Sequence, residues 1–331
     1  MNYCPKILRG QAKIVVILGP TASGKSDLAV KLAKKFNGEV VSADSRQVYK
    51  KMDIGTGKIT KKEMAGVSHH MLDVASPKNR FDVARYQKMA HKKIADILKR
   101  GKLPIVCGGT GLYIKAIVEN PSYPDIPPDW RLREQLDKKT AEQLFAMLKK
   151  FDPERARNID ARNPRRLIRA IEIAKHSGNP RTQKAEQSSY DGNPRTQRAE
   201  QSSYDGQVPT VKTAPKYDAL ILGIKPSREK LKSAIKARLQ KRIKQGMIAE
   251  VKKLRARGIS WRRLEELGLE YKYAALYLQN KMGREEMIKI LETKINQYAK
   301  RQITWFKKTP NARWIKNYRE AVALIKDYDI P

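Results

Sequence analysis

The chain has 331 residues, and 40% of them are hydrophobic, which is enough for one large or two medium domains with a real core. Lysine and arginine number 70 against 34 aspartates and glutamates, so the formal net charge is +36. A basic excess of this size favours a polyanionic partner such as a nucleic acid. The alternative interpretation is a solvated basic surface that only keeps the protein in solution.

The two cysteines, Cys4 and Cys107, are too few and too far apart for a disulfide framework or a zinc site. No apolar run approaches the roughly 20 residues that a membrane span needs, and no signal peptide is recognisable. We therefore expect a soluble, cytoplasmic protein with no membrane partner. We also expect a monomer.

The first predicted strand, residues 13–18, leads into a glycine-bounded loop and then a helix. The loop reads Gly19-Pro20-Thr21-Ala22-Ser23-Gly24-Lys25-Ser26 and matches the phosphate-binding pattern G-x-x-x-x-G-K-S/T. Backbone N–H groups at the start of such a helix point at an anion, Lys25 adds a positive charge, and the Ser26 hydroxyl can hold Mg²⁺. The loop predicts a phosphate-binding site, but it does not identify the molecule that carries the phosphate.

A second short buried strand, residues 39–44, ends in Asp44. This carboxylate leaves the sheet at the edge where ligands of open α/β folds bind. Three interpretations of Asp44 stay open from these residues alone: a Walker-B-like Mg²⁺ ligand, a general base, or a surface turn.

Residues 81–100 show an apolar stripe at helical spacing, and residues 103–107 form a third strand. Gly108-Gly109-Thr110-Gly111 follows that strand as another glycine-rich turn in which Thr110 offers a hydroxyl. Alternating strands and helices with short loops predict a doubly wound parallel sheet. The fold class that we expect is therefore an α/β core like that of P-loop NTPases, flanked by helices.

Proline-rich residues 120–128 mark a domain boundary, after which residues 130–139, 141–150 and 164–175 are predicted as helices. Arg162, Arg165, Arg166 and Arg169 lie near one side of the last of these. Such a helix can bind a nucleic-acid backbone, or the arginines can form a solvated face. Residues 178–215 lack apolar periodicity and carry a 14-residue tandem duplication at 178–205; we interpret them as a polar linker and assign no function to the duplication.

The core pattern resumes with a strand at residues 217–223 and helices at 248–257, 265–278 and 285–304. Before them, Arg238 lies at the edge of a buried helical stripe, and a guanidinium in that position needs an anion or a carboxylate. We expect a discontinuous core domain at residues 1–119 and 216–331. An all-helical insertion at 120–177 and the linker at 178–215 separate its two parts.

Together these segments resemble one family, the tRNA dimethylallyltransferases (isopentenyl-diphosphate:tRNA transferases), in their bacterial form without a zinc-finger extension. The matching segments run in the family's order: residues 19–26, 42–49, 52–56, 69–73, 108–113, 165–172 and 300–306. The resemblance covers nearly the whole chain, and the ordered set is far more specific than any one segment.

The resemblance implies transfer of a dimethylallyl group from dimethylallyl diphosphate to the exocyclic amine of the adenosine 3′-adjacent to a tRNA anticodon. It implies that Asp44 is the general base, and that Lys25, Thr110, Arg238 and, through Mg²⁺, Ser26 hold or activate the diphosphate. The residues that it implies as tRNA contacts are Asp44, Ser45, Arg46, Gln47, Thr110, Arg131, Arg165, Arg166, Leu167, Ile168 and Arg169.

One segment departs from the family, whose members usually carry a glycine-tyrosine-lysine run in the late helices. Here it reads Gly268-Leu269-Glu270-Tyr271-Lys272. Two other functions are compatible with the motifs alone. One is an ATP-dependent kinase or RNA-stimulated NTPase, and the other is a non-enzymatic basic tRNA-binding protein.

Overall fold

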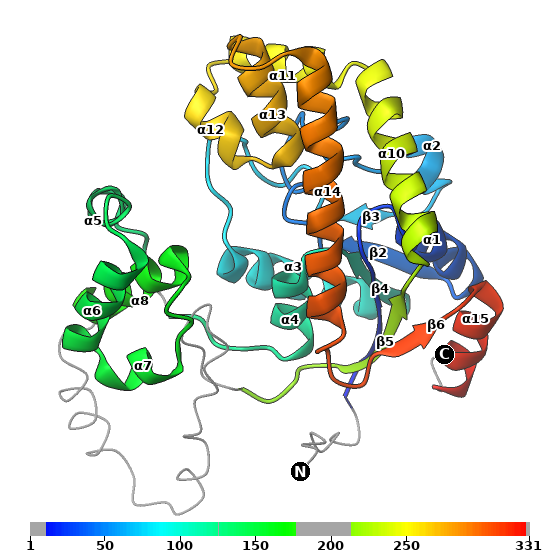
Figure 1. Cartoon of the computed structure of the whole chain (residues 1–331). Helices are drawn as coiled ribbons and strands as arrows, with labels where there is room; N and C mark the ends of the chain where they lie inside the picture. Colours follow the sequence, from blue (N-terminus) through cyan, green and yellow to red (C-terminus); the bar gives the residue numbers. More distant parts are fainter. Residues whose placement is uncertain (1–10, 125, 177–212, 329–331) are drawn as a thin grey trace, which may run out of the picture. The chain divides into compact units, whose positions relative to one another are not determined.

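The computed structural model describes residues 11–124, 126–176 and 213–328 (Figure 1). Contacts within the chain divide it into two units, one of Met1–Val118 with Pro215–Pro331 and the other of Glu119–Ala214. The sequence placed these boundaries at 119/120 and 215/216. The duplicated segment, residues 178–205, lies outside the described residues.

The first unit is built on a parallel sheet. Among the described residues its strands are β1 (Lys13–Leu18), β2 (Gly38–Ser42), β3 (His69–His70), β4 (Leu103–Gly108), β5 (Asp218–Ile224) and β6 (Arg313–Ile315), in the order β3-β2-β4-β1-β5-β6. Every paired neighbour is parallel, with Leu18 opposite Gly108 on one side and Gly223 on the other. This arrangement confirms the predicted fold class, although the two-residue strand β3 has no signal in the sequence.

The central strand β1 is buried on both faces, because successive side chains point in opposite directions. Ile14, Val16 and Leu18 belong to the larger core cluster, whereas Val15 and Ile17 belong to the smaller one. An apolar run without alternation is therefore what a strand covered on both sides requires.

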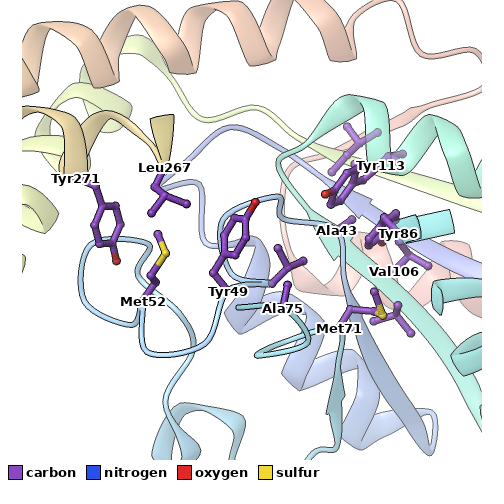
Figure 2. Packing of buried hydrophobic residues seen from close by; sticks show 14 of the residues in the cluster. Ala43, Tyr49, Met52, Met71, Ala75, Tyr86, Val106, Tyr113, Leu267 and Tyr271 are labelled. Atoms are coloured by element: carbon purple, nitrogen blue, oxygen red, sulfur yellow. The ribbon is translucent and has the colours of Figure 1, made fainter. Parts of the chain in front are cut away.

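Helices cover both faces of the sheet. The smaller cluster contains buried residues of α1 (Lys25–Lys35) and α15 (Tyr318–Asp327). The larger contains those of α3 (Val83–Lys99) and α4 (Gly111–Val118), while the short α2 (Lys61–Met64) buries no residue. Tyr86 of α3 and Tyr113 of α4 stack with ring centroids 3.8 Å apart, and the Tyr86 hydroxyl donates to the carbonyl oxygen of Ser42 (Figure 2).

The remaining helices of this unit extend the larger cluster. They are α10 (Arg228–Lys244), α11 (Met247–Ala256), α12 (Trp261–Glu266), α13 (Leu269–Leu278) and α14 (Arg284–Phe306). The long α14 contacts α4, α10 and α13 along its length (Figure 1). The loop after β2 also joins this core, since Met52 is buried in one cluster with Leu267 and Tyr271 (Figure 2).

The described part of the second unit is helical, with α5 (Trp130–Leu136), α6 (Ala141–Phe151), α7 (Pro153–Asn158) and α8 (Pro164–His176). Its own core contains Leu136, Leu144, Leu148, Leu167 and Ile171. A buried carboxylate, Glu172, accepts hydrogen bonds from the Asp129 amide and from Arg133 and Arg169. In neither unit is any described helix long and apolar enough to cross a membrane.

Candidate functional site

The glycine-bounded loop joins β1 to α1 and closes around the first turn of that helix. Gly24 immediately precedes α1 at φ 81°, a left-handed conformation that costs glycine little. The ammonium group of Lys25 donates to the carbonyl oxygen of Pro20 over 3.1 Å, which folds the side chain back over the loop. No side chain among the described residues caps the start of α1, so its first backbone N–H groups stay available for an anion.

Lys25 lies in a strongly desolvated position. Burial lowers its pKa, Arg238 and Arg242 lower it further, and Cys107 and Asp44 oppose the shift. Cys107 itself is a free buried thiol, and burial raises its pKa to about 12. Such an ammonium group binds an incoming anion in competition with little water, and this strengthens the attraction.

Asp44 and Thr110 follow neighbouring strands, β2 and β4, at their carboxyl ends. The Ser45 amide donates to the Thr110 hydroxyl over 3.0 Å, and the Thr110 amide donates to the Ala43 carbonyl over 3.1 Å. The Asp44 carboxylate accepts from the Arg46 amide over 2.9 Å and is half-buried. These bonds fix the direction in which Asp44 leaves the sheet edge.

Gln302 of α14 links the phosphate-binding loop to the second glycine-rich turn. Its side-chain oxygen accepts from the Thr21 amide over 2.9 Å, and its side-chain nitrogen donates to the Gly109 carbonyl over 2.7 Å. A Cβ on Gly109 would come within 2.6 Å of that nitrogen, so the contact needs glycine there. The sequence analysis gave Gln302 no role in the site.

Arg238 lies one helical turn before a second arginine, Arg242, on α10. Burial and, to a smaller extent, the positive charge of Arg242 lower the pKa of Arg238 to about 10, while the negative charges of Glu270 and Asp44 oppose the shift. Both guanidinium groups line one open pocket together with Thr21 and Ala22 of the phosphate-binding loop. The structure therefore gathers Lys25, Arg238 and the loop at one site, as the resemblance implies, and adds Arg242.

The loop at residues 53–58 is fixed by Glu250 of α11. The carboxylate accepts from the backbone amides of Asp53, Ile54 and Gly55 over 2.8, 2.8 and 3.0 Å, and from the Tyr271 hydroxyl over 2.6 Å. The sequence reasoning missed Glu250, and a lone acid on a basic helix was the only signal of it.

The other predicted RNA contacts after β2 lie at the molecular surface. Arg46 is exposed and donates to the Glu266 carbonyl over 3.2 Å, while the Gln47 side chain donates to the Gly57 carbonyl over 3.3 Å. Both side chains are thus held by polar contacts and remain at least partly accessible to a ligand.

In the helical unit the predicted RNA contacts divide into two groups. Arg131 and Arg165 are exposed, and Arg166 lies 3.8 Å from Asp160. Arg169 instead donates to Glu172 and, over 3.0 Å, to the Ile126 carbonyl. It is therefore committed to the fold.

Two residues of the same group are corrected by the structure. The side chains of Leu167 and Ile168 are 0% and 5% exposed and pack into the core of the helical unit. The prediction that they contact tRNA is wrong for their side chains, because both lie on the face of α8 that is turned away from solvent.

For Mg²⁺ the candidate ligand is the exposed Ser26 hydroxyl in the first turn of α1. Among the described residues no group of three or more His, Cys, Asp or Glu side chains could hold a metal ion. A single hydroxyl beside an anion site fits Mg²⁺, which is commonly held by one or two protein oxygens, water and substrate phosphates.

Comparisons with known proteins match this arrangement. The family model described as IPP transferase matches residues 47–309. The tRNA dimethylallyltransferase of Caldanaerobacter subterraneus subsp. tengcongensis is 40% identical over 327 residues, 96% of this chain and 97% of the relative. That of Acetivibrio thermocellus is 39% identical over 306 residues, 91% of each chain.

Solved structures give the same family. The tRNA isopentenylpyrophosphate transferase of Bacillus halodurans superposes with a TM-score of 0.66 at 35% identity, covering 96% of this chain and 95% of its own. A eukaryotic dimethylallyltransferase acting on tRNA gives a TM-score of 0.74 at 26% identity, with 96% and 79% of the two chains covered. On the family model and these identities, the chain belongs to the IPP transferase family.

Proposed function

We propose that this protein is a tRNA dimethylallyltransferase, which transfers a dimethylallyl group from dimethylallyl diphosphate to the exocyclic amine of the adenosine 3′-adjacent to a tRNA anticodon. The observation that carries the proposal is the meeting of an anion-binding loop, a fixed carboxylate and partly buried guanidinium groups at one edge of the sheet. The names of the relatives point to the same reaction class.

The loop and its cations serve the leaving group. When the bond between C1 of the dimethylallyl group and the diphosphate oxygen breaks, the electron pair stays on the diphosphate. Lys25 and Arg238, in a desolvated setting, stabilise that growing negative charge more than they would in water. Bound through the diphosphate and the Ser26 hydroxyl, Mg²⁺ would neutralise more of the same charge.

Asp44 serves the nucleophile. An adenine amine is a poor nucleophile, because its lone pair is delocalised into the ring. As the nitrogen forms its new bond to C1, a proton leaves the nitrogen, and the Asp44 carboxylate accepts it. The Ser45–Thr110 and Arg46–Asp44 hydrogen bonds hold this carboxylate in place before the substrate arrives.

The basic surface of the protein binds the RNA. The target base has to leave its stack to reach a pocket, and phosphate contacts elsewhere supply the binding energy for this. Exposed Arg46, Arg131 and Arg165 have the charge and accessibility for such contacts. We place the reaction in the cytoplasm and expect a monomer to perform it.

One incubation tests the reaction against its rivals. The protein is mixed with unmodified tRNA, Mg²⁺ and either dimethylallyl diphosphate or ATP, and the digested tRNA is analysed by mass spectrometry. Prenylated adenosine supports the proposal. The Lys25→Ala variant should not form prenylated adenosine, because its loop no longer neutralises the diphosphate. Inorganic phosphate released from ATP supports a kinase or NTPase, and binding of tRNA with neither product supports a binding protein.

A further inference from the structure

Arg242 is a buried guanidinium with unused hydrogen-bonding capacity. The residue is 5% exposed, and one of its nitrogens donates to Glu270 over 2.8 Å. Its other terminal nitrogen, Nη2, is buried without a hydrogen-bond partner among the described residues. A buried charged donor left unpaired is costly, so its retention at this position calls for a ligand.

The surroundings of Arg242 identify that ligand as an anion. Arg242 and Arg238 line the same pocket as Thr21 and Ala22 of the phosphate-binding loop, and Ile235, Leu239 and Ile295 complete its wall. Apolar walls keep water away and so strengthen the attraction between the guanidinium groups and an incoming negative charge.

The loop at residues 53–58 makes room for this side chain. A Cβ on Gly57, which has φ 59°, would come within 1.9 Å of Nη2 of Arg242 and 3.1 Å of the same atom of Arg238. Glu250 fixes that loop through its three backbone amides. Both guanidinium groups are thus confined beneath Gly57 and next to the phosphate-binding loop.

The charges at the site do not balance without a ligand. Lys25, Arg238 and Arg242 act on one another as like charges, against the two carboxylates Asp44 and Glu270. Glu270 lies in the segment that departs from the family's usual glycine-tyrosine-lysine run, and its pairing with Arg242 gives that departure a structural role.

We propose that Arg242 is a second guanidinium for the diphosphate of the prenyl donor, held in position by Glu270 and acting beside Arg238. The inference rests on the proposed function, since it assigns an additional binding residue to the same diphosphate. Nη2 of Arg242 donates to a diphosphate oxygen, and the apolar wall of the pocket faces the start of the prenyl chain.

The test measures equilibrium binding of inorganic pyrophosphate with Mg²⁺ by isothermal titration calorimetry, in the absence of tRNA and prenyl donor. Arg242→Met should raise the dissociation constant about 10- to 100-fold, which is the range for losing a hydrogen bond to a charged group. Lys241→Met is the matched control, because it removes the same charge from an exposed neighbour on α10 and should change affinity less than about twofold.

Glu270→Gln separates ligand binding from a purely structural ion pair. It keeps an oxygen acceptor for Arg242 but removes a negative charge beside the anion, so pyrophosphate affinity should stay equal or rise. Equal losses of affinity in Arg242→Met and Glu270→Gln would mean that the pair acts only through the fold, and would overturn the inference.

A second variant at Arg242 and the wild-type protein complete the test. If Arg242→Met does not fold, Arg242→Lys keeps the charge, and it should still bind pyrophosphate more weakly than the wild type; unchanged affinity in the folded variant overturns the inference. If the wild type binds pyrophosphate and no Arg242 variant changes that affinity, the inference is overturned but the proposed function is not. Absence of any wild-type pyrophosphate binding, together with absence of prenylation, overturns the proposed function as well.

Discussion

The side-chain oxygen of Gln302 accepts a hydrogen bond from the backbone amide of Thr21 over 2.9 Å, although 281 positions separate them in the chain. This contact ties the last long helix to the phosphate-binding loop. Because the same side chain also donates to Gly109, one buried residue sets the distance between the two glycine-rich turns.

Replacing Gln302 with methionine should therefore weaken both the fold and donor binding. The Thr21 amide and the Gly109 carbonyl each lose a partner, and an unsatisfied buried group costs about 1–3 kcal/mol. We expect a lower Tm in thermal denaturation and a raised KM for dimethylallyl diphosphate. Thr304→Ala is the control, since that exposed hydroxyl bonds only within its own helix; equal KM values in wild type and Gln302→Met would contradict the linking role.

Replacing Asp44 with asparagine should remove the base and spare the architecture. Asparagine still offers a side-chain oxygen to the Arg46 amide, so the turn is retained. Loss of a general base lowers kcat by roughly 10²–10⁴, whereas tRNA affinity should stay within a few-fold. Single-turnover kinetics and filter binding measure the two quantities. Asp27→Asn, an exposed acid in the first turn of α1, is the control; a kcat near wild type in Asp44→Asn would exclude this base.

A buried carboxylate near the amino end of β2 predicts a pH dependence of stability. Glu39 is 2% exposed and accepts hydrogen bonds from Arg100, Lys102 and His70. The Arg100 guanidinium, with help from Lys102 and His70, holds the pKa of Glu39 well below its ordinary value of 4.5. A lowered folded-state pKa stabilises the protein above the unfolded-state pKa, and this contribution is lost as the pH falls through the folded-state value.

Glu39→Gln should thus lower the Tm by a few degrees at pH 7, and the difference from wild type should narrow once the pH drops below about 4.5. Circular dichroism melts between pH 7 and pH 3 test this. Asp96→Asn provides the comparison, because Asp96 contacts the same Arg100 at 3.2 Å but has a 55% exposed side chain. Its removal should hardly change the Tm at any pH. A difference in Tm between wild type and Glu39→Gln that stays constant with pH would argue against the ion pair.

The parts of the fold that could be predicted are those that depend on residues close together in the sequence. β1, the phosphate-binding loop and α1 follow one another in the chain, so periodicity and a short motif suffice. Gln302, Glu250 and Arg242 could not be found in this way, because each acquires its role from a partner that is distant in sequence or from a buried atom left without one.

The correction at α8 has a similar origin. The motif at residues 165–169 is continuous in sequence, but a helix distributes consecutive residues around its axis, so one stretch contributes both surface and core. The resemblance carried the whole motif over to RNA contacts and did not separate its surface residues from its core residues. Arg169 shows a second reason. Its partner Glu172 is only three residues away on the same helix, but the burial of that carboxylate against the Asp129 amide and Arg133 depends on residues distant in sequence.

Arg165 and Arg169, one helical turn apart on α8, should therefore respond differently to replacement by glutamine. Exposed Arg165 can contact a phosphate, so Arg165→Gln should reduce the slope of log affinity for tRNA against log salt by about one and leave the Tm unchanged. Arg169→Gln removes a cation from the buried carboxylate of Glu172 and should lower the Tm. Fluorescence anisotropy over a salt series and thermal melts measure both effects. An unaltered slope for Arg165→Gln would make that side of α8 a solvated face.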